Sequence, residues 1–267
     1  MTAPNTIQIT DRGDSRIAPF VDIRERDLTG GTDGRFIVEG KVPLSILLTK
    51  SRFELDSLLL SETRLQPLAE ILKTVPTDVP IYVAPRNLMD QIAGFPIHRG
   101  VLACARKGNP DGPSARLKGK RVLVLNQLSN HDNVGAAFRN AAAFGMDSVL
   151  LDEQSCDPLY RKAIRVSSGT SLWLPFHHGG TGGAHLEALK LAGFDIWAMT
   201  PNSDAASLYD LKPPEKLAIL LGAEGPGLPS ALIDMAQAVR IPMRTGFDSI
   251  NVATAGAIAL SHVFSGV

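Results

Sequence analysis

The chain has 267 residues, of which 44% are hydrophobic and 20% charged, as in an ordinary globular protein that buries a core. Its 27 Lys and Arg balance 27 Asp and Glu. Residues 1–118 carry 16 basic and 14 acidic side chains, and residues 119–267 carry 11 and 13. This balance excludes a protein held on nucleic acid by bulk charge, so any RNA binding must use local patches and shape.

The sequence shows no sign of export or membrane insertion. Residues 1–16 are polar and lack an apolar run behind a basic patch, which argues against a signal peptide. No apolar stretch is long enough to span a bilayer. Cys104 and Cys156 lie far apart without a CxxC spacing, which is typical of idle thiols in a reducing cytosol. We therefore expect a cytoplasmic protein without membrane contact.

The N-terminal part predicts a loose tail followed by a small α/β unit. Residues 1–20 are polar without periodicity and predict the tail, and residues 21–107 predict a compact domain. Turn formers then concentrate in 108–119, which we interpret as a linker. Within the domain the pattern predicts strands at 36–38, 81–83 and 101–103, a helix or short strand at 45–48, a short apolar segment at 53–60, and helices at 65–73 and 87–94.

Residues 120–267 alternate between strand-like and helix-like segments, which predicts a mostly parallel sheet with helices on both faces. The segment 217–221 is apolar throughout, as a central parallel strand should be. The expected strands are 121–125, 148–151, 172–176, 196–199, 217–221 and 239–242, and the expected helices are 134–144, 159–166, 184–191, 229–236 and 252–264.

Three strand ends in this half carry unusual residues, and ligands of open α/β sheets gather beyond the carboxyl ends of strands. The first end leads through Asn133 into a helix that carries Arg139 in its second turn. The amides at the start of that helix are free to bind a ligand. Taken alone, this segment favours an ordinary capped surface helix with a solvated arginine.

The second end, Gly222 to Pro229, has three glycines that allow close backbone approach and two prolines that stiffen the loop. Its order G-x-x-G-x-G matches neither a Walker loop nor the dinucleotide fingerprint. A carboxylate placed there, Glu224, needs a hydrogen-bond donor. As a bare pattern, a glycine-rich turn and a functional loop are even alternatives.

The third end runs from Ile241 and Met243 to the last helix. Ser249 stands where a helix N-cap belongs. Asn251 is a second polar residue in the first turn, and the small residues from Ala253 to Ala257 permit close approach of a helix or ligand.

Other chemistries lack their signatures. Adjacent His177 and His178 point to opposite faces of a strand and have no neighbouring ligands that complete a metal site. No G-x-S-x-G elbow occurs, which removes the anchor of a hydrolase triad. No glycine fingerprint follows Leu125, which argues against a nucleotide-dependent oxidoreductase.

Together the three segments resemble the three motifs of the SpoU/TrmH-type RNA 2′-O-ribose methyltransferases of the SPOUT superfamily. Asn133 to Gly145, with Arg139 inside it, resembles the first motif; Leu221 to Leu228 resembles the second; Ile241 to Met243 with Asp248 to Val252 resembles the third. Arg161 to Gly169 resembles the stretch between them. Two departures stand out: Asn130-His131-Asp132-Asn133 replaces the frequent Asp-Pro-x-Asn, and Ile250 replaces Leu.

The resemblance implies a C-terminal domain with a trefoil knot that forms an S-adenosylmethionine pocket. It also implies a homodimer with the active site at the subunit interface. Loops at Thr200, Gly222, Ile241, Met243 and Ile250 would hold the cofactor through backbone groups and apolar contact with adenine. The N-terminal unit resembles the family's RNA-recognition domain through Val38-Glu39-Gly40 and residues 98–103.

The implied reaction moves a methyl group to a ribose 2′-hydroxyl of structured RNA without a metal. The separate N-terminal domain favours rRNA over tRNA. Arg139 stays protonated and is no general base, so we expect it to position the ribose and stabilise the developing oxyanion. Asn133, Ser249 and Asn251 would supply hydrogen bonds, and Glu224 would orient Arg139 or another donor. The alternative is a non-catalytic RNA-binding relative of the same fold, against which the five polar residues argue.

Overall fold

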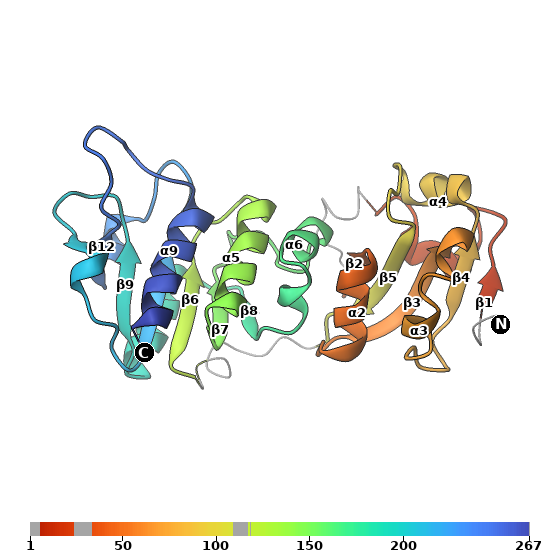
Figure 1. Cartoon of the computed structure of the whole chain (residues 1–267), viewed down its shortest axis with the longest axis horizontal. Coiled ribbons are helices and arrows are strands. Elements are labelled where there is room, and N and C mark those ends of the chain that lie inside the picture. Colours follow the sequence, from red (N-terminus) through yellow and green to blue (C-terminus); the bar gives the residue numbers. More distant parts are fainter. Residues whose placement is uncertain (1–5, 24–33, 109–116, 118, 267) are drawn as a thin grey trace. The chain divides into compact units, whose positions relative to one another are not determined.

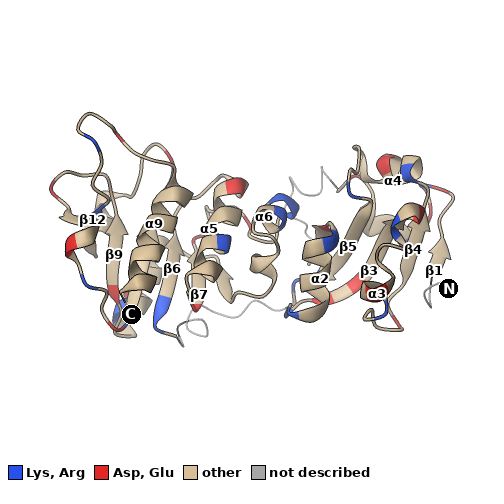
Figure 2. Ribbon diagram, viewed as in Figure 1, with Lys and Arg blue, Asp and Glu red and all other residues tan. Residues whose placement is uncertain are grey.

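The structure, a computed structural model, describes residues 6–23, 34–108, 117 and 119–266. Two compact units emerge from it. The first comprises the described residues of Met1–Asn109 together with Leu159–Trp173, and the second those of Pro110–Pro158 and Leu174–Val267. The predicted linker at 108–119 lies almost wholly outside the described residues. Basic and acidic residues are interspersed in each unit (Figure 2), in keeping with the balanced sequence.

The first unit is built on a five-stranded mixed sheet in the order β1-β4-β3-β5-β2 (Figure 1). The first three of these strands run parallel to one another, and β5 runs antiparallel to both β3 and β2. The elements are β1 (Thr6–Gln8), a 3₁₀ turn (Ser15–Phe20), β2 (Arg35–Glu39), α2 (Lys41–Thr49), β3 (Glu54–Ser61), a 3₁₀ turn (Glu62–Arg64), α3 (Ala69–Leu72), β4 (Ile81–Ala84), α4 (Arg86–Ala93) and β5 (Val101–Arg106).

The expected loose tail at residues 1–20 is wrong for the part that the structure describes. Residues Thr6–Gln8 pair with β4 as an edge strand, and Ile9, Ile17 and Phe20 are buried. These apolar residues are spaced too irregularly to show a helical or strand period, so the pattern concealed their part in the core. The single helix expected at 65–73 is also wrong: residues 65–68 form turns and only the short α3 is helical there, since the ring of Pro67 disfavours a helical conformation of the residue before it.

A segment from the second half of the sequence completes the first unit. It holds α6 (Arg161–Val166) and a 3₁₀ turn (Thr170–Leu172). The guanidinium of Arg161 pairs with the carboxylate of Glu39, whose side chain is 5% exposed, and lies 4.6 Å from the ring centroid of Phe95. Gly169, at φ +84°, packs so closely on α2 that an added Cβ would lie 3.3 Å from the Cα of Pro43. The buried carboxylate of one segment therefore depends on a cation from a distant one.

The second unit contains seven strands, all parallel, in the order β10-β12-β9-β11-β6-β7-β8. This confirms the predicted α/β class with its mostly parallel sheet. The central strand covers the predicted residues Leu217–Leu221, all buried. The strands are β6 (Arg121–Leu125), β7 (Ser148–Leu151), β8 (Phe176–His178), β9 (Asp195–Met199), β10 (Ala206–Ser207), β11 (Leu217–Leu221) and β12 (Gln237–Arg240). The strand expected at 172–176 is displaced, because Leu172 ends a 3₁₀ turn and β8 begins only at Phe176.

Helices cover both faces of this sheet. On one face lie α7 (Gly182–Leu191) and α8 (Ser230–Ile233), whose leucines share a core cluster with Leu220 of β11. On the other, α5 (His131–Ala143) and α9 (Val252–Ser265) lie side by side (Figure 1). There α9 is so close to β11 that a Cβ on Gly256 would lie 2.8 Å from the Cδ1 of Leu221. Successive strand residues point to opposite faces, so Leu220 and Leu221 each anchor one helical layer.

The 3₁₀ turn Leu208–Asp210 completes the elements of the second unit. The trefoil knot implied by the family resemblance stays a prediction. In the part of the chain that the structure describes, no helix has both the length and the apolar character required to cross a membrane.

Candidate active site

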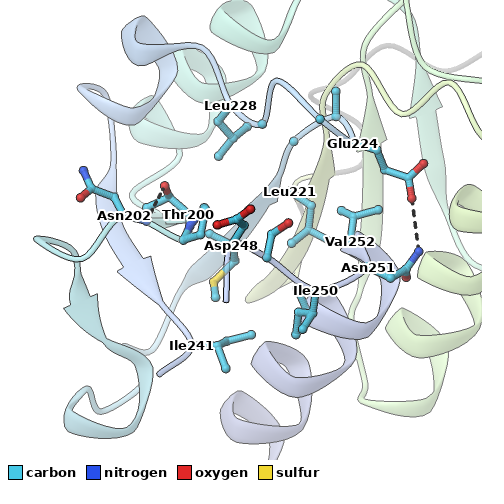
Figure 3. A pocket seen from close by; sticks show the side chains of 18 of the residues that line it. Thr200, Asn202, Leu221, Glu224, Leu228, Ile241, Asp248, Ile250, Asn251 and Val252 are labelled. Atoms are coloured by element: carbon cyan, nitrogen blue, oxygen red, sulfur yellow. Dashed lines mark hydrogen bonds between the residues drawn. The ribbon is translucent and has the colours of Figure 1, made fainter. Parts of the chain in front are cut away.

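A cavity of about 860 Å³ opens in the second unit beyond the carboxyl ends of β9, β11 and β12 (Figure 3). Its volume lies within the range of small-molecule sites. The walls come from the segments that follow these three strands and from the start of α9, namely residues 199–203, 221–228, 241, 243, 247–252 and 255.

All five residues expected to hold a cofactor line this cavity: Thr200, Gly222, Ile241, Met243 and Ile250. Gly222 permits the closest approach of the chain to itself, because a Cβ there would lie 2.7 Å from the backbone nitrogen of Leu228. Atoms at that separation overlap, so any larger residue at position 222 displaces the 222–228 loop. The walls combine apolar side chains with polar groups, which suits a small molecule that has both apolar and polar parts.

Three of the predicted polar residues form one hydrogen-bonded cluster at the cavity. The amide nitrogen of Asn133 donates to Oε1 of Glu224 at 2.5 Å. Nδ2 of Asn251 donates to Oδ1 of Asn133 at 3.0 Å and to the same Glu224 oxygen at 3.2 Å. Figure 3 shows the Glu224–Asn251 bond beside the cavity. The cluster joins α5, the loop after β11 and the start of α9, so the carboxylate has the donors that its position requires.

The cap of α9 is Asn251, and the assignment of Ser249 to that position is corrected. Oδ1 of Asn251 accepts hydrogen bonds from the amides of Ala253 and Thr254 at 2.9 and 3.2 Å. Ser249 lies two residues upstream, exposed and lining the cavity. Serine and asparagine are both good N-caps. Asn251 has this position because its Nδ2 also donates to Asn133 and Glu224.

Arg139 does not join the cluster. Since α5 begins at His131, Arg139 lies in its third turn, whereas the sequence reading placed it in the second. It is exposed and absent from the cavity walls, while Asn133 is buried. Six residues along a helix correspond to about 240° of rotation, so the two side chains leave different faces. From the sequence, either Arg139 or another residue was expected to donate to Glu224. In the structure the donors are Asn133 and Asn251.

The sequence reading missed a buried hub that holds the chain before α5. Oδ1 of Asp152, a residue only 3% exposed, accepts hydrogen bonds from the amide of Gln127 at 2.9 Å and from the hydroxyl of Ser155 at 2.6 Å. The Ser155 hydroxyl oxygen accepts from the amide of Leu128 at 3.0 Å. These bonds fix the path from β6 towards Asn130, the N-cap of α5. The only signal was an aspartate placed directly after a buried strand, at the ligand-binding edge.

The histidine pair in β8 is engaged in packing. His178 Nε2 lies 2.9 Å from the Ser155 carbonyl oxygen, and the His177 ring stands edge-on to that of His185 at 5.6 Å. Burial lowers the pKa of His185, and His177 lowers it further, while the Gly179 backbone opposes the shift. Among the described residues no group of three or more His, Cys, Asp or Glu is arranged to hold a metal ion.

Comparison with known families assigns the second unit. Residues 120–261 match the model of the SpoU rRNA methylase family. The chain belongs to this family. The match spans the cluster, the cavity and the α5–α9 layer, and it confirms the resemblance to SpoU/TrmH-type RNA methyltransferases.

Individual relatives match a larger part of the chain than the family model does. A tRNA/rRNA methyltransferase of Mycobacterium bovis that has not been characterized is 38% identical over 260 residues, covering 94% of this chain and 89% of the relative. The 23S rRNA (guanosine-2′-O-)-methyltransferase RlmB of Acinetobacter baylyi is 29% identical over 210 residues, covering 74% and 83%.

The crystal structure of an AdoMet-bound rRNA methyltransferase from Sinorhizobium meliloti has the same fold. It superposes with a TM-score of 0.81 at 19% identity and covers 97% of both chains. Family membership and this cofactor-bound neighbour support S-adenosylmethionine as the cofactor, as the sequence predicted.

Proposed function

We propose that this SpoU-family enzyme methylates a ribose 2′-hydroxyl in structured RNA, with rRNA favoured over tRNA. One observation carries the proposal: the Asn133–Glu224–Asn251 cluster stands at the cavity, with its hydrogen bonds made and Ser249 beside it. The 2′-O activity of RlmB on 23S rRNA supports the same reaction here.

The cavity suits S-adenosylmethionine, which supplies an activated methyl group when bound. Apolar side chains such as Leu221, Leu228 and Ile250 line it, and they exclude water from a bound ring. Thr200 and Asn202 supply polar groups on the opposite side of the cavity from Glu224 (Figure 3). We assign cofactor binding to Thr200, Gly222, Ile241, Met243 and Ile250.

The chain's polar residues would hold the ribose hydroxyl. The hydroxyl of Ser249 is exposed to the cavity and is able to accept or donate a hydrogen bond. Asn251 is fixed by four hydrogen bonds, two that cap α9 and two within the cluster. A rigid cluster holds its donors in place before the reaction, which is how an enzyme stabilises developing charge without reorganisation.

We assign Arg139 to the ribose and its developing oxyanion in a homodimer. Its guanidinium is exposed and has no hydrogen bond or ion pair with any other described residue. A two-fold dimer presents each surface patch twice, so an exposed arginine on α5 is available to the site of the second copy. A guanidinium stays protonated and acts there by charge and position.

The test is transfer of labelled methyl from S-adenosylmethionine to unmodified 23S, 16S and transfer RNA, followed by nucleoside analysis. Wild type and Arg139→Ala are compared, with S-adenosylhomocysteine binding as the control for folding. The proposal requires label in a 2′-O-methylnucleoside, strongest on an rRNA and lost in the variant. Label on a base refutes ribose specificity, and cofactor binding without transfer to any RNA favours the non-catalytic relative.

A further inference from the structure

The loop from β12 to α9 presents an exposed aromatic ring at the mouth of the cavity. Phe247 is 63% exposed. It belongs to the five large hydrophobic side chains most exposed among the described residues, the others being Val42, Leu191, Tyr209 and Phe264. Of these five, only Phe247 lines the cavity. A single exposed apolar side chain on a protein surface needs no explanation. Phe247, however, lines a ligand cavity, so its ring is placed to contact a bound ligand.

A tight turn of the backbone joins Phe247 to a basic residue, Arg244. The amide of Phe247 donates to the carbonyl oxygen of Arg244 at 3.2 Å, and Gly246 between them adopts φ +85°, as the third residue of such a turn requires. Arg244 is exposed and forms no hydrogen bond or ion pair through its side chain with the rest of the described chain.

An aromatic face and a cation are the two groups with which proteins hold unpaired nucleotides. The ring stacks on a base, and the cation pairs with the backbone phosphate. Sequence-specific RNA recognition uses bases that are splayed out of the structure and stacked on aromatic side chains. The turn thus has the chemistry for a nucleotide that has left its stack.

We propose that Phe247 stacks on the base of the nucleotide whose ribose is methylated, and that Arg244 pairs with an adjoining phosphate. The inference rests on the proposed function. Ser249, two residues after Phe247, lines the cavity. Two residues span at most about 7 Å, a distance comparable to the breadth of a nucleotide. A ribose held at Ser249 therefore places its base within reach of the ring.

The competing occupant is the adenine of the cofactor, and burial argues against it. Leu221 and Leu228, which line the same cavity, are 1% and 9% exposed and offer a buried apolar surface to a ring. Phe247 stands at the solvent side, where a large ligand arriving from outside covers it.

The experiment measures RNA and cofactor binding separately for Phe247→Leu and Phe247→Trp. Tyr209→Leu is the control, because Tyr209 is 60% exposed and does not line the cavity. The probes are an unmodified 23S rRNA transcript and S-adenosylhomocysteine. Loss of one stacked base is expected to weaken RNA binding and raise the KM for RNA about 5- to 150-fold. Cofactor affinity stays at the wild-type value, Phe247→Trp retains RNA binding, and the control resembles wild type.

The salt dependence of RNA binding tests the cation. Arg244→Ala is expected to reduce the slope of log K against log salt by about 0.7, the value for one phosphate of a single strand. Lys190→Ala, an exposed cation on α7 that does not line the cavity, should leave the slope unchanged.

Two results overturn the inference. If Phe247→Leu weakens S-adenosylhomocysteine binding but not RNA binding, the ring covers adenine. If it changes neither, the ring is a surface residue without a ligand. Both readouts are binding measurements, so they decide the inference even if wild type transfers no methyl group, an outcome that instead refutes the proposed function.

Discussion

The two ends of the Asn251 side chain perform separable tasks, and Asn251→Asp separates them. The oxygen caps α9 through Ala253 and Thr254, while the nitrogen donates to Asn133 and Glu224. The aspartate variant keeps a capping oxygen and loses the nitrogen donor. We expect it to remain folded and to lose most methyl transfer.

The magnitudes follow from the bonds that are kept and lost. Loss of an N-cap costs about 1 kcal/mol, and this cost is avoided because a carboxylate caps at least as well. The lost donor served a charged acceptor, and such bonds contribute about 1.5–3 kcal/mol. The introduced carboxylate also faces Glu224, and two charges about 4 Å apart repel by about 1 kcal/mol in water and about 4 kcal/mol at a typical protein surface. Both residues are exposed, so solvent screening brings the repulsion towards the lower of these two values.

We therefore expect kcat/KM to fall about 10- to 150-fold, the equivalent of one charge-assisted hydrogen bond. Asn251→Asp and Asn251→Ala both lose the bonds of the side-chain nitrogen, so urea unfolding should show lower stability for each, and Asn251→Ala should lose about 1 kcal/mol more through its missing cap.

A pH series provides the decisive control. Repulsion from Glu224 raises the pKa of the introduced carboxyl group. Below that pKa the protonated carboxyl regains a donor for Glu224, so the activity of the variant relative to wild type should rise as the pH is lowered. Wild-type activity at pH 7, or a ratio independent of pH, would refute the reasoning that the nitrogen donor organises the cluster.

Three further predictions concern single residues. Gly222→Ala should weaken S-adenosylhomocysteine binding in calorimetry, since its Cβ meets backbone 2.7 Å away, while Gly183→Ala, which meets nothing within 4 Å, should bind normally. An equimolar mixture of inactive Arg139→Ala and Glu224→Ala chains should recover about a quarter of wild-type activity after subunit exchange, because half the dimers then hold one complete site; no recovery would place both residues in one chain's site. The folded protein lowers the pKa of His185 from the unfolded value of 6.5. Its contribution to the free energy of unfolding is therefore fully present above pH 6.5 and declines as the pH falls below that value. In His185→Leu, the free energy of urea unfolding should depend less on pH below 6.5.

The elements that the sequence predicted best are those with a continuous or strongly periodic apolar pattern. Residues 121–125, 148–151 and 217–221 are strands with the predicted bounds, because each has an unbroken run of buried apolar residues, which Arg121 and Ser148 precede in the first two. The last helix was placed to within one residue of its end, since small and apolar residues, interrupted only by His262, run from Val252 to Phe264. Such segments can be predicted from their own sequence, without knowing which strands or helices they pack against.

The sequence predicted which polar residues belong to the site, but not which of them form hydrogen bonds with one another. Asn133, Glu224 and Asn251 were singled out as polar residues at strand ends, yet the sequence separations of 91 and 118 residues hid which donor meets which acceptor. Asp152 was missed for the same reason. Its role is to accept hydrogen bonds from the amide of Gln127 and the hydroxyl of Ser155, and no spacing in the sequence shows that these groups meet.

The segment Leu159–Trp173 has a practical consequence for anyone who divides this protein. A fragment that ends at the apparent linker contains Glu39, a residue 4% exposed in the whole chain, without its counter-ion Arg161. Removing one partner of a buried pair typically costs about 3–5 kcal/mol, much of the stability of a small domain. An isolated fragment of the first unit therefore needs either residues 159–173 grafted onto it or a neutral residue at position 39. Each unit is formed from two separate stretches of the sequence, so a single cut between them yields neither unit whole.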